Sequence, residues 1–240
     1  MRKKLVALLA ALLLVGVAAA QGDIPTLEYD TFIEGELTEE ANQRTYTLAA
    51  EAGDTVLVEM RRGEDSSLFS TALTINGPNG RPVADTTDGR SSDVAAAVFV
   101  AEETADYEVI ATRNEFSSST GGYLLRALVL TPVEADEGVE GVVSNASYDQ
   151  YHLLPNDLGM LNLRYAQQDG DYVLISRLNL VGRNGRLSAL TSTSALPGVA
   201  LTTTTETDED FLYILSLGAD TTDYEFSEVD SAYEVEVLTP

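Results

Sequence analysis

The stretch Leu73-Thr-Ile-Asn-Gly-Pro-Asn-Gly-Arg81 returns 105 residues later as Leu178-Asn-Leu-Val-Gly-Arg-Asn-Gly-Arg186. Each copy is an alternating strand segment that ends in Gly-x-Asn-Gly-Arg. Asn-Gly is the preferred dipeptide of a tight β-hairpin turn, because both of its positions can adopt a positive φ. The two stretches therefore predict the same hairpin twice, and with it an internal duplication of the chain.

Further matches recur in the same order on both sides of the hairpins. They are Glu34-Gly35 over Glu140-Gly141, Tyr46 over Tyr151, Asp106-Tyr107-Glu108 over Asp223-Tyr224-Glu225, and Leu-Thr-Pro at 130–132 and 238–240. They place a first repeat at 26–132 and a second at 139–240, joined by an acidic linker at 133–138. The Asp-Tyr-Glu match has an offset of 117 rather than 105, so about 12 additional residues are expected within 190–205.

Short segments rich in β-formers alternate with turn signals along both repeats. They lie at 55–60, 72–75, 94–100, 107–111 and 123–130, and again at 148–154, 159–165, 171–176, 211–217 and 233–238. The threonine-rich stretch at 202–205 is expected to be a polar loop. This pattern predicts an all-β chain with two tandem antiparallel jelly-roll-like β-sandwich domains, each of seven to nine strands.

The N-terminus has the pattern of a secretory signal peptide. Arg2-Lys3-Lys4 precedes an apolar run over 5–20, which ends in Ala18-Ala19-Ala20. The run is shorter than the roughly 20 residues that a membrane-spanning helix needs. We therefore expect residues 1–20 to be removed, with no insertion in the membrane. The mature protein would be secreted, or periplasmic if the source has an outer membrane.

Composition excludes several classes of partner and chemistry. The chain has 240 residues, a net charge of −25, one histidine and no cysteine, which excludes disulfides, thiolate metal sites and thiol catalysis. Without residues 1–20 it keeps 11 arginines and no lysine against 39 acidic residues, a net charge of −28. Such a surface repels nucleic acid and anionic membranes.

Catalysis has little support in the residues. His152 is the one imidazole that could serve a Ser-His-Asp triad, and the chain contains no Gly-x-Ser-x-Gly motif. Paired carboxylates are so frequent that any two neighbours carry little information about glycoside hydrolysis. We expect a protein that is not an enzyme.

Calcium is the better chemical hypothesis, because it binds several oxygens on a loop that can wrap around it. Asp85, Asp88 and Asp93 share one loop, and the acidic stretch with Asp208 and Asp210 is taken as its counterpart in the second repeat. The spacing is not that of an EF-hand. The alternative is that these acidic loops are solvated surface.

Recurring tyrosines are expected to be structural rather than a platform for sugars, because a tyrosine that opens a strand usually buries its ring. They are Tyr46, Tyr107, Tyr123, Tyr151, Tyr224 and Tyr233. Arg81 and Arg186, which close the two hairpin turns, would mainly offset local acidity.

The order of motifs resembles that of the bacterial pre-peptidase C-terminal domain. The first repeat carries Gly35-Glu-Leu37, Thr45-Tyr46-Thr-Leu48, Ala52-Gly53-Asp54, the hairpin at 73–80 and Gly122-Tyr123-Leu-Leu. The second repeat lacks the Ala-Gly-Asp turn and has Ala232-Tyr233 in place of Gly-Tyr. The resemblance implies a secreted β-sandwich module without catalytic activity. Some relatives bind collagen or polysaccharide, and some bind calcium.

Together these observations predict a secreted tandem β-sandwich protein that acts as an extracellular binding or adhesion module. Its partner would be a polysaccharide, a protein or the cell envelope, with calcium as a candidate stabiliser. The duplication supports this mildly, since two weak sites on one chain gain avidity. The alternative is a structural or self-assembling protein of the cell exterior.

Overall fold

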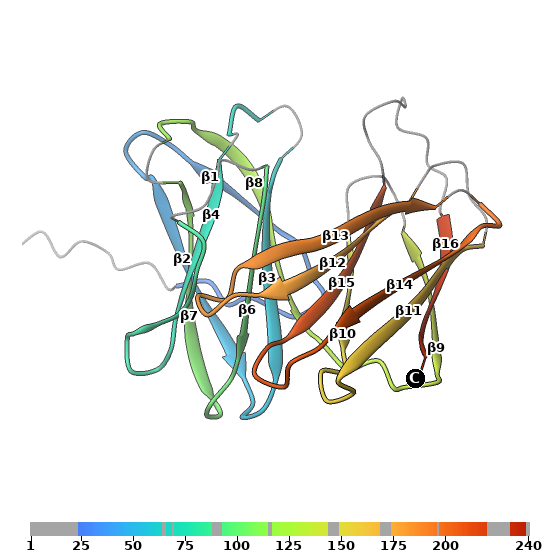
Figure 1. The fold of residues 1–240 in the computed structure, drawn as a ribbon. Coiled ribbons are helices and arrows are strands. Elements are labelled where there is room, and N and C mark those ends of the chain that lie inside the picture. The colour runs from blue at the N-terminus through green and yellow to red at the C-terminus, as the bar shows by residue number, and fades with distance from the viewer. Residues whose placement is uncertain are drawn as a thin grey trace, which may run out of the picture.

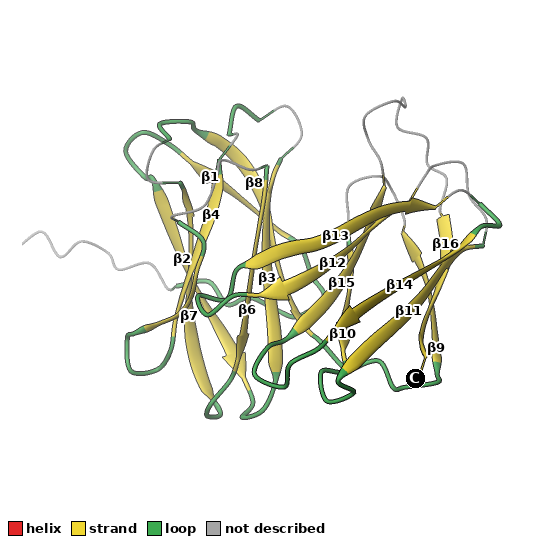
Figure 2. Ribbon diagram, in the orientation of Figure 1, coloured by secondary structure: helices red, strands yellow, loops and turns green. Residues whose placement is uncertain are grey.

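The computed structural model describes residues 24–63, 66–68, 70–87, 93–114, 117–143, 149–168, 174–195, 197–219 and 231–238. These residues form sixteen β-strands and no helix (Figure 2), which confirms the all-β prediction. The expected signal peptide at 1–20 and Asp88 lie outside the described residues. Within them, no helix is long and apolar enough to cross a membrane.

The first eight strands build an N-terminal sandwich and the last eight a C-terminal sandwich (Figure 1). The former comprises β1 (Ile33–Leu37), β2 (Gln43–Ala50), β3 (Thr55–Arg62), β4 (Thr71–Asn76), β5 (Pro82–Asp85), β6 (Val94–Val100), β7 (Ala105–Arg113) and β8 (Gly121–Val129). The latter comprises β9 (Gly138–Val143), β10 (Gln150–Leu154), β11 (Met160–Gln167), β12 (Leu174–Val181), β13 (Leu187–Ala195), β14 (Ala200–Glu206), β15 (Tyr213–Ala219) and β16 (Ser231–Leu238).

Both sandwiches have the same antiparallel topology. The N-terminal one pairs the sheets β1-β8-β3-β6 and β2-β7-β4-β5, and the C-terminal one pairs β9-β16-β11-β14 and β10-β15-β12-β13. Eight strands in this order form a jelly roll. One apolar cluster fills each sandwich between its two sheets, because alternate residues of every strand point inward.

A glycine and tyrosine pair marks the same place in both sandwiches. Gly35 on β1 faces Tyr123 on β8 so closely that a Cβ would overlap the ring, and Gly141 on β9 faces Tyr233 on β16 in the same way. The Tyr123 hydroxyl lies 2.6 Å from the hydroxyl of Tyr46. This pair ties the two sheets of the N-terminal sandwich together across its core.

In the C-terminal sandwich the Tyr233 hydroxyl lies 2.8 Å from Nε2 of His152. His152 is therefore the counterpart of Tyr46, and the match of Tyr46 with Tyr151 is wrong by one residue. A shift of one residue moves a side chain to the other face of its sheet. Tyr151 accordingly packs outside the core, against the apolar cluster between the two sandwiches.

The match at Asp223-Tyr224 is also wrong. Tyr107 pairs with Leu48, two residues after Tyr46, and Tyr213 pairs with Leu154, two residues after His152. The counterpart of Tyr107 is thus Tyr213, 106 residues later, and Tyr224 lies outside the described residues.

The prediction of a 12-residue insertion within 190–205 is therefore wrong. This stretch contains β13 and β14, which take the same places in their sheets as β5 and β6. The threonines at 202–205 belong to edge strand β14 rather than to a loop, since β-branched residues suit a half-exposed strand whatever their polarity.

The acidic connection at 133–138 packs against the C-terminal sandwich. Val133 is buried and its N–H bonds to the carbonyl of Leu153, as the N–H of Leu27 bonds to that of Thr47. Asp136 adopts a positive φ of 61°, which matches the 59° of Asp30. Residues 133–138 therefore repeat the structure that leads into β1.

The two sandwiches meet through a third apolar cluster. It joins the outer face of β3, β6 and β8 to the outer face of β10, β12 and β15, through Leu57, Val98, Leu130, Leu153, Val181 and Ile214. The β12–β13 turn also reaches the N-terminal sandwich (Figure 1). There the carbonyls of Asn184 and Gly185 accept the N–H groups of Asp85 and Val98, at 2.8 and 2.7 Å.

The β12–β13 hairpin reaches this far because it is longer than β4–β5. Ile75 pairs with Val109, two residues after Tyr107, and Leu178 pairs with Leu215, two residues after Tyr213. The turn begins two residues after Ile75 but four residues after Leu178. The two residues added per strand carry the second Asn-Gly turn to the β5–β6 edge.

Candidate functional site

The outer face of β1-β8-β3-β6 is built from cross-strand rows of side chains. Glu34, Leu124, Arg61 and Val94 pair across all four strands and form the first row. The second row contains Arg126 beside Glu59, and the third contains Leu128, Leu57 and Val98. A fourth row places Thr55 beside Val100. The C-terminal sandwich covers the third row, so that the first and the fourth lie at opposite ends of the contact.

The second row belongs to a buried cluster of charges. Glu59 is fully buried, and its carboxylate accepts hydrogen bonds from Nε of Arg61 at 2.6 Å and Nε of Arg126 at 2.7 Å. Arg126 also donates from Nη2 to the backbone carbonyl of Asp149 at 2.6 Å. The Asp149 carboxylate lies 3.7 Å from Arg61 and 3.9 Å from Arg177. Three arginines and two carboxylates from both sandwiches thus lie within ion-pair distance of one another.

Burial and neighbouring charges shift the pKa values in this cluster. Burial raises the pKa of Asp149, although Arg61, Arg177 and Arg126 oppose the rise. Burial also raises the pKa of the Tyr151 hydroxyl, and the charges of Glu59 and Asp149 raise it further. Burial lowers the pKa of the Arg61 guanidinium, but the negative charges of Glu59 and Asp149 outweigh this effect and leave the pKa raised. The Arg61 guanidinium is therefore held as a cation.

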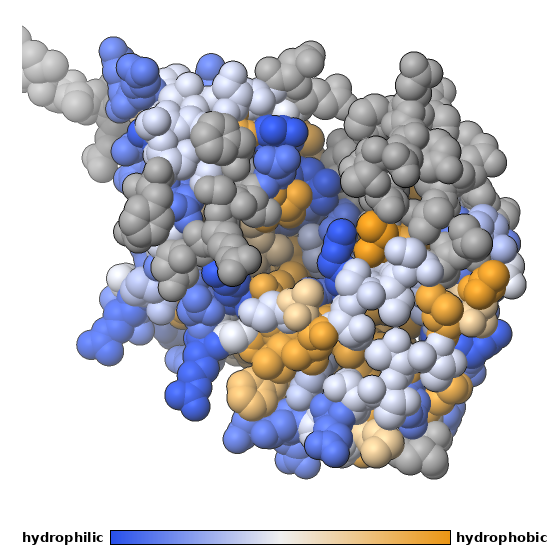
Figure 3. Space-filling model, turned by 45° about the horizontal axis from the view of Figure 1, so that its top comes forward, coloured by the Kyte–Doolittle hydropathy of each residue, from blue (hydrophilic) through white to orange (hydrophobic). Residues whose placement is uncertain are grey.

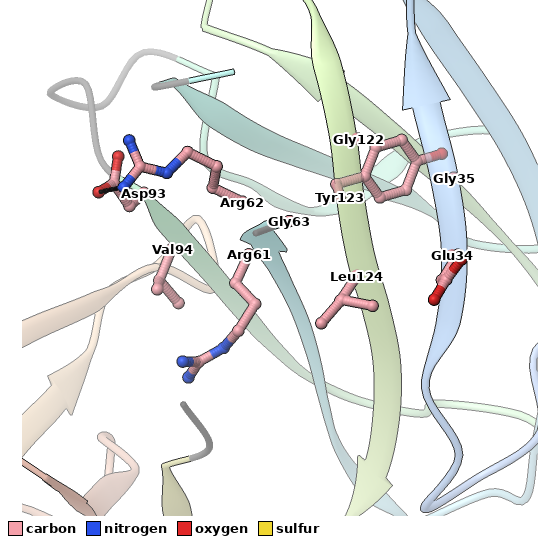
Figure 4. A pocket seen from close by; sticks show the side chains of 10 residues that line it. All are labelled: Glu34, Gly35, Arg61, Arg62, Gly63, Asp93, Val94, Gly122, Tyr123 and Leu124. Atoms are coloured by element: carbon pink, nitrogen blue, oxygen red, sulfur yellow. Dashed lines mark ion pairs between the residues drawn. The ribbon is translucent and has the colours of Figure 1, made fainter. Parts of the chain in front are cut away.

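A cleft of about 550 Å³ lies over the first row of the sheet face. Leu124 and Val94 form its apolar part, and Glu34, Arg62 and Asp93 supply charge (Figure 4). Arg62 pairs with Asp93 at 3.2 Å. Figure 3 shows the hollow between the two sandwiches, with hydrophobic and hydrophilic residues at its walls.

The cleft combines polar and apolar groups on a rigid floor. Strand pairing sets the positions of Leu124 and Val94, and the bonds to Glu59 hold the Arg61 side chain beneath the cleft. Such a surface offers charged hydrogen-bonding groups beside a small apolar patch, which is the usual make-up of a ligand site.

The predicted calcium ligands do not form one site in the described residues. Asp85 accepts hydrogen bonds from the N–H and hydroxyl of Thr87, at 2.8 and 2.7 Å, and Asp93 pairs with Arg62. Asp208 accepts the N–H of Asp210 at 3.0 Å. No group of three or more potential ligands comes together in the part of the chain that the structure describes.

The two acidic loops also occupy different places in their sandwiches. Asp85 and Asp93 flank the β5–β6 connection, whereas Asp208 and Asp210 lie between β14 and β15, the counterpart of the β6–β7 connection. The equivalence proposed from the sequence is therefore wrong, and its cause is the misplaced insertion. Calcium binding itself stays a prediction.

The other singled-out residues have structural surroundings. His152 is held by Tyr233, and burial lowers the pKa of its imidazole. The Tyr107 hydroxyl donates to the carbonyl of Glu103 at 3.1 Å. Arg81 is exposed on its turn, and Arg186 lies in the turn that contacts the N-terminal sandwich.

Sequence reasoning missed the charge cluster and the cleft. One signal was present, because Glu59 interrupts the apolar run of β3 and Arg126 interrupts that of β8. Charged residues are seldom fully buried unless paired, so two of them inside buried strands indicate an ion pair. Asp149 could not be found in this way, since its position depends on the contact between the sandwiches.

Comparisons with known proteins found similar folds. No family model and no curated protein sequence matches the chain. Among solved structures, the pre-peptidase C-terminal domain of a collagenase from Bacillus anthracis is similar at 13% identity and a TM-score of 0.36, over 44% of this chain and 94% of that one.

Two other structures match a larger share of the chain. The tandem CBM22-1–CBM22-2 domains of Xyn10C from Paenibacillus barcinonensis match at 10% identity and a TM-score of 0.28, over 81% of this chain and 82% of that one. The PBSX exported protein XepA matches at 13% identity and a TM-score of 0.26, over 87% and 86%. At these identities the likeness concerns the fold alone.

Proposed function

We propose that this protein is a secreted, non-catalytic binding module and that its ligand is an extracellular polysaccharide. The cleft over the first row of the β1-β8-β3-β6 face carries this proposal. It lies at one end of that face, beside the contact with the C-terminal sandwich, and a buried ion-pair cluster fixes its floor.

The chemistry of the cleft suits a sugar chain. Sugar rings present hydroxyl groups at their edges and C–H groups on their faces. Glu34, Arg62 and Asp93 can exchange hydrogen bonds with hydroxyls, while Leu124 and Val94 can pack against a ring face. A neutral chain also avoids the repulsion that a strongly acidic protein exerts on anions.

Two features support a role without catalysis. The one histidine bonds to Tyr233 inside the C-terminal sandwich rather than at the cleft. The buried Glu59 accepts a hydrogen bond from an arginine on each of its two carboxylate oxygens, so both oxygens are already engaged inside the protein. The order of motifs along the first repeat supports an origin in a pre-peptidase C-terminal domain, and residues 1–20 support secretion.

The test is binding of residues 21–240 to insoluble cellulose, chitin, xylan and peptidoglycan, measured by depletion from solution. We expect saturable binding to at least one of these, and Arg62→Ala and Leu124→Ala should each weaken it by roughly three- to tenfold. Arg164→Ala is the matched control. Arg164 lies on the corresponding face of the C-terminal sandwich, has the same 42% side-chain exposure as Arg62 and pairs with Glu236 at 3.2 Å.

Equal weakening by the Arg164 and Arg62 variants would contradict the cleft as the site. Binding to none of the four polymers would contradict the polysaccharide. Release of new reducing ends during incubation would contradict the non-catalytic role. Thermal midpoints of all variants are measured in parallel, so that a loss of binding is distinguished from a loss of fold.

A further inference from the structure

A second groove, of about 730 Å³, lies at the other end of the same sheet face. β6 and the start of β5 form one wall, and the β12–β13 turn with the β14–β15 loop forms the other. Val98, Val181 and Leu212 belong both to this groove and to the apolar contact between the sandwiches. The groove therefore continues an interface that already exists in the chain.

β6 presents an edge to this groove. It pairs with β3 on one side, while on the other side the N–H of Val98 bonds to the carbonyl of Gly185 in the turn. Backbone groups of alternate residues point to the same side of an antiparallel strand. The N–H and carbonyl of Val100 consequently point away from β3, beyond the tip of the turn. The Val100 side chain is 45% exposed.

The rim of the groove carries an excess of negative charge. Glu102, Glu209 and Asp210 line it and are exposed, against the single cation Arg183. Its apolar part includes Val83, Phe211 and Leu212. An occupant that complements this surface would carry apolar side chains together with positive charge.

We propose that this groove binds an extended, basic peptide segment of a partner protein, which adds to the edge of β6. The backbone of the segment would bond to Val100, as the turn bonds to Val98. An apolar side chain would pack against Val100 and Phe211, and a Lys or Arg would meet Glu102 and Asp210. Strand addition of this kind takes its affinity from main-chain bonds and its specificity from alternate side chains. A second copy of this chain fits poorly, because it carries 39 acidic residues against 14 basic ones.

The experiment titrates the 15N-labelled protein with a blocked peptide Arg-Val-Thr-Val-Arg at physiological salt. We expect the amide resonance of Val100 to shift saturably and its hydrogen exchange to slow. Val100→Pro removes the backbone N–H that would donate to the peptide and should raise the dissociation constant about tenfold. Proline is tolerated on an edge strand, so the variant should keep its fold. The double variant Glu102→Gln/Asp210→Asn should raise it about fivefold.

The matched control is Glu103→Gln/Glu206→Gln, which removes the same charge from residues that do not line the groove. The control should leave the dissociation constant unchanged. If it weakens binding as much as the groove variant, the peptide is held by overall charge and the proposal is wrong. The proposal is equally wrong if Val100 does not respond at saturating peptide, or if the peptide Glu-Val-Thr-Val-Glu binds as well. None of these three results depends on the polysaccharide cleft.

Discussion

His152 takes the place of a tyrosine, and this exchange makes the C-terminal sandwich sensitive to acid. Burial lowers the pKa of its imidazole below the ordinary 6.5, so the fold favours the neutral ring. The unfolded chain then binds the proton more readily than the folded one. Stability is therefore full above pH 6.5 and falls as the pH drops from 6.5 toward the folded pKa.

We expect His152→Gln to remove this part of the pH dependence. The difference in unfolding free energy between pH 7 and pH 5.5, measured in urea, should be larger for the wild type than for the variant. Each unit by which the pKa is lowered corresponds to about 1.4 kcal/mol. His152→Tyr would recreate the Tyr46–Tyr123 pair of the other sandwich and serves as a second variant. Parallel pH profiles for all three proteins would contradict the assignment.

Gly80 and Gly185 offer a matched pair of substitutions on equivalent turns. Both have a φ of +73°, but a Cβ at Gly80 meets nothing within 4 Å, whereas a Cβ at Gly185 would overlap the Val98 carbonyl and Ala84. Gly80→Ala should cost only the left-handed backbone penalty, about 1–2 kcal/mol. Gly185→Ala should cost clearly more, because it also separates the turn from β5 and β6. Urea midpoints compare the two, and equal losses would show that the turn contributes nothing to the contact.

Among the connecting elements, the acidic β14–β15 loop is held in place by the chain itself. The side chain of Asn156 donates to the carbonyls of Glu209 and Phe211, at 2.9 and 2.8 Å, and so fixes the β14–β15 loop. If this loop binds calcium, Ca²⁺ will raise the thermal midpoint saturably at constant ionic strength and Mg²⁺ will not, and Asp208→Ala will abolish the rise. If both ions raise it equally, the cause is screening of the negative charge.

Strands and turns could largely be predicted from residues, whereas their relative register could not. The Asn-Gly turns and the apolar runs of β3, β6 and β8 are local signals, and each gave an element near its observed position. The similar sequences of the two hairpin turns gave no sign that the β12–β13 hairpin is longer than the β4–β5 hairpin. That difference becomes visible only through pairing with β7 and β15, over which local sequence has no influence. For the same reason the cleft, which needs four strands and both sandwiches, had no sequence signal of its own.

At the scale of the whole molecule, the contact between the sandwiches rests on residues whose counterparts are polar. Ile214 corresponds to Glu108, Leu57 to Asn162 and Val98 to Thr204. Even the buried pair Glu59–Arg126 has a half-buried counterpart with reversed charges, in which Arg164 faces Glu236. A third sandwich would have to pack on the outer face of β2-β7-β4-β5 or of β9-β16-β11-β14. At these positions both faces carry polar residues, as the terminal repeats of repeat proteins do. We expect sedimentation as a monomer, and assembly that grows with concentration would contradict this reading and favour the self-assembling alternative.

Ile214→Glu tests the contact with the residue that the other sandwich carries at this position. Ile214 is fully buried in the apolar cluster between the sandwiches, and an unpaired carboxylate there would cost several kcal/mol. Because the cores of the two jelly rolls are separate clusters, both should remain folded while the contact opens. Calorimetry should then resolve two transitions in place of one, and the hydrodynamic radius should increase. Val142→Glu, at a 46% exposed position on β9, is the control that should change neither. A single unchanged transition in Ile214→Glu would contradict the apolar cluster as the contact that couples the two sandwiches.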